Sequence, residues 1–300
     1  DDWLTTALLV TRAPILFAPA MNTSMYEHPA TQANIEILRG RGCHFIGPDS
    51  GPLACGTVGI GRMVEPRVVV EAAIPLLDPR NDLAEKRVLI TSGGNREPID
   101  PVRFIGNRSS GKMGRALALE ALARGARVSV VSGPAEIPLP YGVNLYTVET
   151  AVEMAEAVAA LAPEADVILG AAAVADYRPA NGASQKRPRT GEPLTLILVE
   201  NPDILMSLGK TKRPGQILVG FAAETHDIVA NAKAKLKKKN LDLIVANQVS
   251  TPDSGFGTDS LRAYLIEASG TELDLGLISK EDLAQKVLDR VAALLHSPTR

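Results

Sequence analysis

Long apolar segments are missing from this sequence. The longest, around Val167–Ala175, is far shorter than the roughly 20 residues that cross a bilayer as a helix. No charged and then apolar leader opens the chain. We therefore expect a soluble, cytoplasmic protein that has no membrane partner.

Cysteine is also scarce, since only Cys43 and Cys55 occur among the 300 residues. They are not spaced as CxxC, and no histidine stands at metal-ligand spacing from either. This scarcity excludes a disulfide framework and an ordinary zinc site, and it fits a reducing compartment. The four histidines form no recognisable catalytic triad or metal cluster; they are His28, His44, His226 and His296.

An excess of charge of either sign is missing as well. The chain has 34 acidic and 32 basic side chains and a formal net charge of -2. Such a balance gives no overall attraction to nucleic acid or to an anionic membrane. Any anion site must therefore be local, and we expect small-molecule partners.

The sequence does contain enough apolar material for two folded units, because 45% of its 300 residues are hydrophobic. We place the boundary after the turn residues Asp78-Pro79, which predicts domains at 1–80 and 81–300. The chain begins with Asp1 and leads directly into a strand-like segment, so we expect a fragment that starts inside its first domain. In that domain we predict strands at 14–20 and 43–46, a glycine-rich loop at 47–63, and helices at 29–39 and 65–77.

The second domain alternates strands with helices. It opens with the strand 87–94, a long loop, the helix 112–124 and the strand 126–134, which together form a βαβ unit. Later strands are predicted at 166–177, 194–200, 217–225, 241–249 and 261–268, and later helices at 151–161, after 203, at 227–240 and at 280–295. This alternation predicts a Rossmann-like, doubly wound, mostly parallel sheet that binds ligands at the carboxyl ends of its strands.

The first loop of this domain ends with Ser109-Ser110-Gly111 at a helix start, where backbone N–H groups and the helix dipole favour an anion. A phosphate is the natural ligand, although Ser110 could equally act only as a helix cap. Asn107 offers a neutral amide for a carbonyl or carboxylate, and as an isolated residue it is also typical of turns.

A second candidate segment is GAAAVADY, at the predicted strand end Gly170–Tyr177. Its small side chains would let a flat ring lie against the backbone, or would serve close helix packing. Asp176 could accept hydrogen bonds from a base or ribose, or cap the next turn.

The predicted helix 227–240 carries five lysines within seven residues. Lys235 and Lys239 share one face and could approach one anion, and a triphosphate would supply a counter-charge that the sequence does not show. The alternative is a solvated helix whose cations suit the dipole at its carboxyl end. Lys186 lies in the polar segment 178–193, a candidate mobile flap, and could complete such a cage.

Two residues of the first domain are also candidates. Cys55 stands in the glycine-bordered loop, which exposes a thiol, whereas Cys43 belongs to a predicted strand and is expected in the core. Asn22 ends the turn PAMN, and a structural role remains open for both Asn22 and Cys55.

Taken together, these motifs resemble one family across the whole chain, the bacterial bifunctional phosphopantothenoylcysteine decarboxylase/phosphopantothenate-cysteine ligase. The segments that carry the resemblance follow in the family's order: PAMN, ATQANIEIL, GPDSGPLACGTVGIGRM, NREPIDPVRFIGNRSSGKMG, AAVADYRP, NPDI, GFAAET and KNLDLIVAN.

The resemblance implies that the first domain is the C-terminal part of a flavodoxin-like α/β flavoprotein domain. In the family, this FMN-dependent part decarboxylates 4'-phosphopantothenoylcysteine to 4'-phosphopantetheine. Asn22 would hold the substrate carboxylate and Cys55 would donate a proton. The family's first flavin-phosphate loop and catalytic histidine are not found here, so we expect little or no decarboxylase activity.

For the second domain, the resemblance implies a CTP-dependent ligase of coenzyme A biosynthesis that joins 4'-phosphopantothenate to L-cysteine through an acyl-cytidylate, with bound Mg²⁺. Asn107 would contact the acyl group, and Lys186 would serve both catalysis and CTP binding. A homodimer of ligase domains is implied, with a higher assembly when the flavoprotein domain is complete. The other residues that would hold CTP are Gly170, Ala171, Ala172, Asp176, Pro202, Asp203, Ile204, Leu205, Phe221, Lys235 and Lys239.

Two other functions compete with this interpretation. A nicotinamide-dependent oxidoreductase is disfavoured because GxGxxG is missing and the second strand ends Val131-Ser132-Gly133, without an acid for the ribose. Tyr177 is also followed four residues on by Asn181 rather than by the lysine of short-chain dehydrogenases. A non-catalytic flavoprotein-like binding subunit is the second rival, and it predicts no turnover of CTP.

Overall fold

The computed structural model of the chain describes residues 2–77, 80–189, 191, 193–248 and 258–296. Two compact units, Asp1–Arg80 and Asn81–Arg300, make up the chain. Within the described ranges, no helix has both the length and the apolar character that crossing a membrane requires. The turn expected at Asp78-Pro79 and the end of the strand expected at 241–249 lie outside the described residues.

The first unit is a small α/β arrangement in which β1 and β2 pair in parallel, with Leu16 opposite His44. Helix α1 was not predicted from the sequence, which we took to start with a strand. It forms because the Asp2 carboxylate accepts a hydrogen bond from the Thr5 N–H at 2.8 Å, and the Thr5 side chain returns the contact as a capping box. The elements are α1 (Trp3–Val10), β1 (Leu16–Phe17), α2 (Thr23–Glu27), α3 (Pro29–Gly40), β2 (His44–Phe45), β3 (Asp49–Pro52), β4 (Val58–Arg62) and α4 (Pro66–Leu77).

The glycine-rich segment 47–63 is a β-hairpin rather than the loop that we expected. Strands β3 and β4 pair antiparallel. A Cβ at Gly61 would lie 2.0 Å from the Met21 carbonyl oxygen, and one at Gly59 would lie 2.5 Å from Thr23 Oγ1. These glycines therefore allow the hairpin to lie directly against the start of α2, and the Met21 N–H donates to the Gly61 carbonyl at 2.9 Å.

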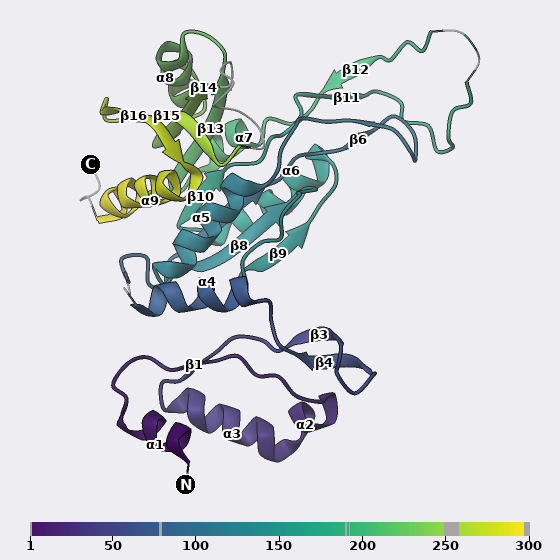
Figure 1. Ribbon diagram of the computed structural model, residues 1–300. Helices are drawn as coiled ribbons and strands as arrows, with labels where there is room; N and C mark the ends of the chain where they lie inside the picture. Colours follow the sequence, from purple (N-terminus) through teal and green to yellow (C-terminus); the bar gives the residue numbers. More distant parts are fainter. Residues whose placement is uncertain (1, 78–79, 190, 192, 249–257, 297–300) are drawn as a thin grey trace. The chain divides into compact units, whose positions relative to one another are not determined.

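The second unit contains an eight-stranded sheet with the strand order β16-β15-β14-β13-β10-β5-β8-β9 (Figure 1). The strands from β14 to β9 are parallel, and β15 and β16 extend the sheet antiparallel. This confirms the predicted α/β fold with a mostly parallel, doubly wound sheet. Its strands are β5 (Arg87–Ser92), β8 (Arg127–Ser132), β9 (Asn144–Thr147), β10 (Val167–Gly170), β13 (Ile217–Glu224), β14 (Leu243–Gln248), β15 (Ser260–Glu267) and β16 (Glu272–Ser279).

Helices cover both faces of the sheet, which explains why the central strands are continuous apolar runs. On β5, Val88 and Ile90 pack into a core formed with α5 and α9, and Leu89 points into a second core formed with α6, α7 and α8. Each fully buried Leu or Ile contributes about 1.5–3 kcal/mol. The helices are α5 (Lys112–Ala123), α6 (Ala151–Leu161), the 3₁₀ turn η1 (Ala162–Glu164), α7 (Ile204–Thr211), α8 (Ile228–Lys238) and α9 (Lys280–His296).

The order in which the chain adds strands to the sheet reverses at its centre, between β5 and β10. From β5 the chain moves outward through β8 and β9, and it then returns to β10 on the other side of β5. Backbones approach closely here: a Cβ at Gly133 would lie 1.8 Å from the Gly94 carbonyl oxygen, and one at Gly114 would lie 2.2 Å from Ser92 Oγ. In a doubly wound sheet, a ligand crevice lies at the carboxyl edge where the strand order reverses, here between β5 and β10.

An arm leaves the unit between β10 and α7. It contains β11 (Tyr177–Pro179) and β12 (Leu198–Glu200), which pair antiparallel with each other and outside the main sheet. The sequence analysis was wrong to count 194–200 as a sheet strand, because β10 pairs directly with β13 and leaves no place between them. Figure 1 shows the arm extending away from the sheet, beside the short hairpin β6 (Glu97–Pro98) and β7 (Phe104–Ile105).

Candidate functional site

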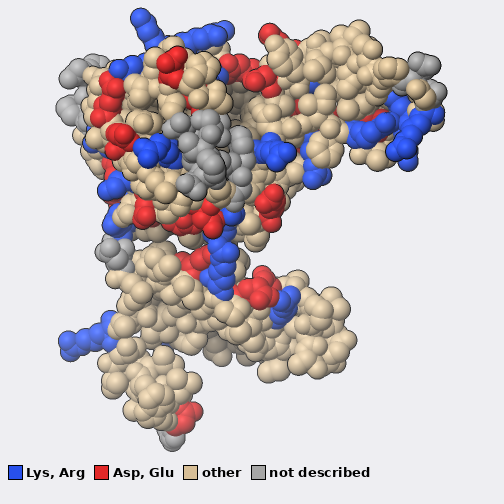
Figure 2. Space-filling model, turned by 45° about the horizontal axis from the view of Figure 1, so that its top comes forward, with Lys and Arg blue, Asp and Glu red and all other residues tan. Residues whose placement is uncertain are grey.

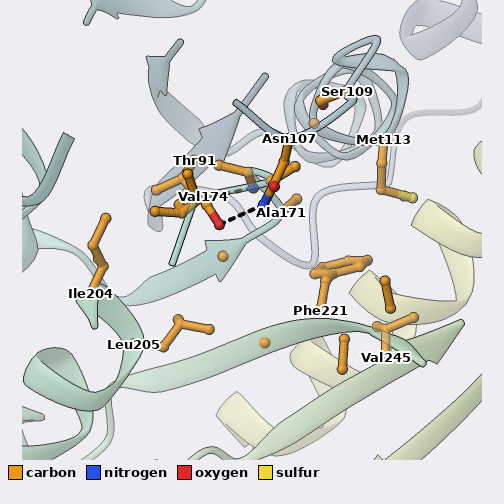
Figure 3. A pocket seen from close by; sticks show the side chains of 18 of the residues that line it. Thr91, Asn107, Ser109, Met113, Ala171, Val174, Ile204, Leu205, Phe221 and Val245 are labelled. Carbon is orange, nitrogen blue, oxygen red and sulfur yellow. Dashed lines mark hydrogen bonds between the residues drawn. The ribbon is translucent and has the colours of Figure 1, made fainter. Parts of the chain in front are cut away.

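A cavity of about 650 Å³ opens at the carboxyl ends of β5, β10, β13 and β14. This is the edge at which a doubly wound sheet binds ligands. Asn107 and the segments 109–114, 170–177, 200–205 and 220–223 line it, together with side chains from the end of α8. Figure 3 shows part of this lining.

Backbone forms one wall of the cavity, at the end of β10. A Cβ at Gly170 would lie 2.7 Å from Leu205 Cδ2, so the backbone approaches α7 more closely than a larger residue would allow. The Ala172 N–H donates to Thr91 Oγ1 at 3.2 Å, and the Ala173 N–H donates to the Gly93 carbonyl at 2.9 Å. These bonds tie the wall to β5 and hold it in place.

Asn107 lies across this wall. Its Nδ2 donates to the Val174 carbonyl at 2.9 Å, and the side chain lies among the lining residues (Figure 3). The amide joins the loop after β5 to the segment after β10, which are the two sides of the crevice. The Asn107 side chain is thus fixed in the cavity, where an amide can contact a ligand carbonyl.

Apolar side chains line the other sides. Figure 3 shows Phe221, Met113 and Val245 on one side of the cavity and Ile204 and Leu205 on the other. Phe221 is only partly buried where β13 reaches the edge. Between the backbone wall and this ring, the cavity suits a flat, partly apolar group.

The segment after the arm returns to the cavity through Asn201. Its Nδ2 donates to the Ala175 carbonyl and its N–H donates to the Asp176 carbonyl, each at 2.8 Å. Pro202 and Asp203 follow at the start of α7, and both line the cavity. This pairing places Asp176, at the end of one crevice segment, beside the start of the next.

Lys235 of α8 and Lys239, the C-cap of this helix, both line the cavity, and each has a carboxylate partner. Lys235 Nζ lies 2.6 Å from Glu224 Oε1, and Lys239 Nζ lies 2.9 Å from Asp203 Oδ2. The sequence analysis expected that a triphosphate would have to supply the counter-charge, and this argument was wrong. The partners come from β13 and from the start of α7, which sequence spacing does not place beside α8.

Asp203 has two roles in this arrangement. Its side chain accepts from the Met206 N–H at 3.0 Å as the cap of α7, and it also accepts from Lys239. Burial raises the pKa of Asp203, but these hydrogen bonds outweigh burial and leave the pKa below its usual value. The carboxylate is therefore ionised at neutral pH.

Lys186 is the candidate that the structure does not bring to the cavity. It is exposed on the arm, outside the lining residues. Figure 2 shows basic side chains gathered towards the end of the arm, and Lys186, Arg187 and Arg189 belong to this part of the chain.

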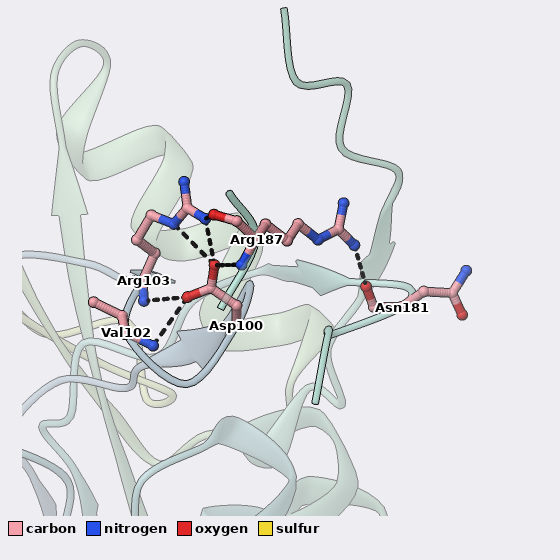
Figure 4. A network of polar contacts seen from close by, with 5 residues as sticks. All are labelled: Asp100, Val102, Arg103, Asn181 and Arg187. Carbon is pink, nitrogen blue, oxygen red and sulfur yellow. Dashed lines mark hydrogen bonds and ion pairs between the residues drawn. The ribbon is translucent and has the colours of Figure 1, made fainter. Parts of the chain in front are cut away.

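The arm is held to the turn between β6 and β7 at the residue after Lys186. The Asp100 carboxylate accepts from the Arg187 N–H at 3.2 Å and from Arg103 Nε at 2.9 Å, and Arg103 Nη2 donates to the Arg187 carbonyl at 2.8 Å (Figure 4). Hydrogen bonds from Arg103 hold the pKa of the Asp100 carboxyl well below its usual range. We call this set of three residues the arm clamp.

The remaining ligase candidates all line the cavity, from segments as far apart in the chain as 107 and 239. They are Asn107, Gly170, Ala171, Ala172, Asp176, Pro202, Asp203, Ile204, Leu205, Phe221, Lys235 and Lys239.

Other lining residues were not singled out from the sequence. Lys112, at the start of α5, and Lys280, at the start of α9, line the cavity, and so does Asn247 at the end of β14. Lys112 follows directly on the predicted anion-binding helix start, which could have indicated it. No local motif marks Lys280, because only the packing of α9 against α5 brings it here.

In the first unit, the hairpin brings Asn22 and Cys55 together. Asn22 Nδ2 donates to Cys55 Sγ at 3.1 Å, and Thr57 Oγ1 lies 3.2 Å from the same sulfur. Hydrogen bonds from the Thr57 side chain and backbone, and then from Asn22, lower the pKa of the exposed Cys55 thiol to about 7. Cys55 is thus partly thiolate at neutral pH and open to solvent.

Within the described residues, no group of three or more His, Cys, Asp and Glu side chains forms a metal site. Magnesium does not require such a group, since it commonly binds through one or two carboxylates together with substrate phosphates and water. Asp176 and Asp203 are carboxylates that line the cavity and could serve in this way.

Comparison with known families assigns both units. Residues 1–77 match the family described as flavoprotein, and residues 83–295 match the family described as DNA/pantothenate metabolism flavoprotein C-terminal domain. The coenzyme A biosynthesis bifunctional protein CoaBC of Escherichia coli (strain K12) is 45% identical over 303 residues, which cover 100% of this chain and 74% of that protein.

Solved structures are similar to about three quarters of the chain. The crystal structure of the C-terminal domain of a CoaBC protein is 38% identical with a TM-score of 0.62, and it covers 73% of this chain and 100% of that chain. A Cab2 variant in complex with phosphopantothenate-cysteine has a TM-score of 0.57 at 19% identity, and it covers 76% of this chain and 91% of that chain. The second likeness is one of fold alone.

Proposed function

The chain belongs to the CoaBC family of coenzyme A biosynthesis proteins, and from this membership we propose that residues 81–300 form a phosphopantothenate-cysteine ligase that uses CTP. The observation that carries this proposal is the cavity at the carboxyl edge of the sheet, which combines a backbone wall, an aromatic ring and two lysines. The ligand of the Cab2 structure, phosphopantothenate-cysteine, corresponds to the product of this reaction.

The reaction has two steps because a carboxylate is a poor acyl donor. In the first, an oxygen of the phosphopantothenate carboxylate attacks the α-phosphorus of CTP, so that an acyl-cytidylate forms and pyrophosphate leaves. In the second, the amine of cysteine attacks the acyl carbon, CMP leaves, and the amine gives up a proton. The protein's task is to align the two substrates and to stabilise charge on the phosphates.

The backbone wall and Phe221 support nucleotide binding. A cytosine ring is flat, and the wall at Gly170, Ala171 and Ala172 lets such a ring approach the main chain, with Phe221 on the apolar side. Pro202, Asp203, Ile204 and Leu205 form the neighbouring wall, and Asp176 offers a carboxylate for the ribose or base.

Lys235 and Lys239 serve the phosphates in this proposal by exchanging partners. Each ammonium already lies against one carboxylate, and the Lys235 side chain is 45% exposed. An ammonium carries three donors on a flexible stem, so it can contact a phosphate oxygen as well as its present partner or instead of it. The ion pairs with Glu224 and Asp203 thus keep the two lysines in position before the nucleotide binds.

Asn107 serves the acyl group. One N–H of its amide bonds the Val174 carbonyl, which leaves the second N–H for the substrate carboxylate and later for the acyl carbonyl. A neutral donor stabilises developing negative charge on the carbonyl oxygen without holding the carboxylate as an ion pair. Mg²⁺, when bound with the nucleotide, supplies further charge stabilisation at the phosphates.

In this proposal, Lys186 contributes to CTP binding and catalysis only when movement of the arm brings it to a ligand-binding cavity of this kind. The arm clamp fixes the backbone of the adjacent Arg187, so movement of Lys186 requires rotation about this fixed point or release of the clamp. Long polar loops beside a site commonly act as lids of this kind.

A homodimer accompanies the proposed function. The arm exposes apolar side chains, among them Ile197 at 71% and Leu198 at 43%, on a two-stranded ribbon that belongs to no larger sheet in the described structure. A second copy would cover these side chains. Light scattering after gel filtration should give twice the chain mass, and a monomer at micromolar concentration would contradict this.

The pairing of Asn22 with Cys55 favours a second activity, the FMN-dependent decarboxylation of the ligase product. Asn22 would hold the substrate carboxylate, and Cys55 would protonate the product. Measurement of bound flavin and of carbon dioxide released from phosphopantothenoylcysteine tests this for the present chain. Release of carbon dioxide that Cys55→Ser abolishes would support this activity, and no release from a flavin-loaded protein would reject it.

The ligase proposal is tested by incubating the protein with phosphopantothenate, cysteine, Mg²⁺ and each nucleoside triphosphate in turn while pyrophosphate is measured. We expect the fastest release with CTP. Lys235→Ala and Lys239→Ala should each lower kcat/KM for CTP at least about tenfold, since a charge-assisted hydrogen bond is worth about 1.5–3 kcal/mol. Lys237→Ala is the matched control, because Lys237 is exposed on the same helix and lies outside the lining.

The outcomes separate the rival functions. No pyrophosphate with any nucleotide would reject the ligase and favour the non-catalytic binding subunit. A preference for ATP would keep the ligase and correct the nucleotide. Equal loss in the Lys237, Lys235 and Lys239 variants would mean that overall charge, rather than position in the cavity, matters.

A further inference from the structure

Asn95 is a buried residue of the loop after β5, and the proposed function gives it no role. Only 2% of its surface is exposed. Among the residues that the structure describes, neither the side-chain nitrogen nor the side-chain oxygen of Asn95 has a hydrogen-bond partner, and no other described side chain has two such buried atoms. An amide enclosed in this way destabilises the fold, because it has lost its bonds to water and gained none in return.

The backbone on both sides of Asn95 is fixed. Gly94 forms a parallel bridge with Ala173, next to the backbone wall of the cavity. On the other side, the Arg96 N–H donates to the Glu149 carbonyl at 2.8 Å. Asn95 is therefore anchored between the cavity wall and the segment that precedes α6, and a partner for its amide must come from a neighbouring segment that moves to it.

The segment 106–108 lies against Asn95 and can supply such a partner. A Cβ at Gly106 would lie 2.3 Å from the Asn95 carbonyl oxygen, so the two backbones are in direct contact. Residues 106–108 are exposed and belong to no helix or strand. Backbone of this kind rearranges more easily than a buried strand or helix does.

This segment carries Asn107, which contacts the acyl group in the proposed function. In the structure, Asn107 Nδ2 donates to the Val174 carbonyl at 2.9 Å. A substrate that binds the second N–H of this amide also acts on the backbone of 106–108. The Asn95 amide, with two donors and one acceptor beside this backbone, can bond it once it shifts.

From these observations we propose that Asn95 is a positioning residue of the ligase. When the acyl substrate engages Asn107, the segment 106–108 shifts onto Asn95, and the Asn95 amide bonds its backbone and holds Asn107 against the acyl group. The inference rests on the proposed function, which names the acyl substrate. An amide that is unpaired before binding and paired afterwards favours the shifted arrangement only when substrate is present.

The first test is the sign of a change in stability. Asn95→Leu keeps the approximate shape of the side chain and removes the amide. Without substrates we expect Tm to rise by about 2 °C or more, since an unpaired polar group leaves the interior. Gln216→Leu is the contrast, because the buried Gln216 amide donates to the carbonyls of Ala162 and Ala165 at 2.8 Å and 2.7 Å. Its Tm should fall.

The second test is kinetic and uses the full chain with phosphopantothenate, cysteine, CTP and Mg²⁺. Asn95→Leu should lower kcat about tenfold and leave KM for CTP within about twofold, because the wall proposed for the nucleotide is unchanged. Asn95→Thr keeps a donor and an acceptor, so it should recover most of the lost kcat. Gln216→Leu, assayed below its Tm, should keep the kcat of the unchanged protein.

A fall in the Tm of Asn95→Leu would overturn the proposal, because it would show that the amide is already satisfied, as by a buried water, and serves only the fold. An unchanged kcat would overturn it as well. If the unchanged protein releases no pyrophosphate with any nucleotide, the ligase proposal fails instead. The rise in Tm that phosphopantothenate alone produces then decides: a smaller rise in Asn95→Leu keeps the inference, and equal rises reject it.

Discussion

Thr57 is the largest influence on the Cys55 thiol, because its side chain and backbone both bond the sulfur. Thr57→Val keeps the shape of the side chain and removes the hydroxyl. We expect the thiol pKa to rise from about 7 towards its usual value. A rise of one unit lowers the thiolate fraction at pH 7 about fivefold, and alkylation slows in proportion. The measurement is the rate of iodoacetamide labelling between pH 6 and 9.

Cys43 is half-buried and is the other free thiol, so Cys55→Ser supplies the background rate. Asn22→Ala should move the profile in the same direction by less, since Asn22 is the smaller influence. A labelling profile that is identical in the Thr57 variant and the parent would show that another group ionises the thiol.

The sequence predicted individual site residues correctly where they belong to a recognisable local motif. Asn22 was selected through PAMN and Cys55 through its glycine-bordered loop, and the structure places Asn22 Nδ2 3.1 Å from Cys55 Sγ. Lys280 was missed because nothing near it in the chain marks it, and only the packing of α9 brings it beside Lys112. The carboxylate partners of Lys235 and Lys239 were missed for the same reason, since Glu224 and Asp203 belong to other elements.

The arm is an element whose position depends on the arm clamp. Asp100→Asn removes the charge that holds Arg103 and weakens the acceptor for the Arg187 N–H. We expect trypsin at pH 8 to cut after Lys186 or Arg189 severalfold faster than in the unchanged protein, because a released backbone fits the protease more readily. Mass spectrometry of the early fragments is the measurement.

The pH dependence of the clamp follows from the sign of the shift. The pKa of Asp100 is lower in the folded protein than the value of about 3.9 for a free side chain. Its stabilisation is therefore complete above about pH 4 and is lost as the pH falls through the folded value. Glu164→Gln, which breaks an exposed pair with Arg87, is the control and should leave arm cleavage unchanged.

Helices α5 and α9 are joined by the buried Arg124. Its guanidinium bonds Glu120 at 2.8 Å, Asp82 at 3.1 Å and Asp289 at 2.5 Å, and its side chain is 1% exposed. Arg124→Met should lower the free energy of unfolding by about 3 kcal/mol, since it leaves carboxylates without their buried partner. Urea denaturation followed by circular dichroism measures this.

Arg127→Met is a close comparison, because Arg127 pairs with Glu85 at 63% and 80% exposure. Exposed pairs contribute about 0–1 kcal/mol. Similar losses in the two variants would mean that burial of Arg124 has no special weight.

Strands β5 and β13 were predicted well because they are long apolar runs that are buried on both faces of the sheet. Helix α6 was predicted well because one of its faces repeats apolar residues over several turns. The prediction failed for 194–200, whose apolar pattern fits a sheet strand although Leu198 and Val199 are exposed on the arm. Strands β9 and β16 were missed because they lie at the two edges of the sheet, where exposed side chains weaken the pattern.

For the whole molecule, the position of the cavity within the second unit predicts that this unit works without the first. Every lining residue lies between Thr91 and Lys280, inside the second unit. We expect residues 81–300 alone to release pyrophosphate with a kcat within about twofold of the full chain, because folded domains commonly keep their own sites. Lys239→Ala in the same segment is the control for background hydrolysis. A loss above tenfold in a folded segment would show that the first unit contributes to the ligase.

The order of strands could be anticipated in part. The alternation of strands and helices predicted a doubly wound sheet, and the observed sequence of β9, β8, β5, β10, β13 and β14 has that topology. The antiparallel pair β15 and β16 could not be inferred from alternation, because no helix separates these strands from each other.

The wall at Gly170–Ala173 has a consequence for how the protein can change. Main-chain atoms are the same whichever residue the gene encodes, and a Cβ at Gly170 would meet Leu205. Substitutions in this wall are therefore not expected to change which nucleobase the proposed site prefers, whether they arise in evolution or in laboratory selection. Adaptive substitutions should accumulate across from it, at Phe221 and around Pro202, where a new side chain changes the shape presented to the proposed nucleotide.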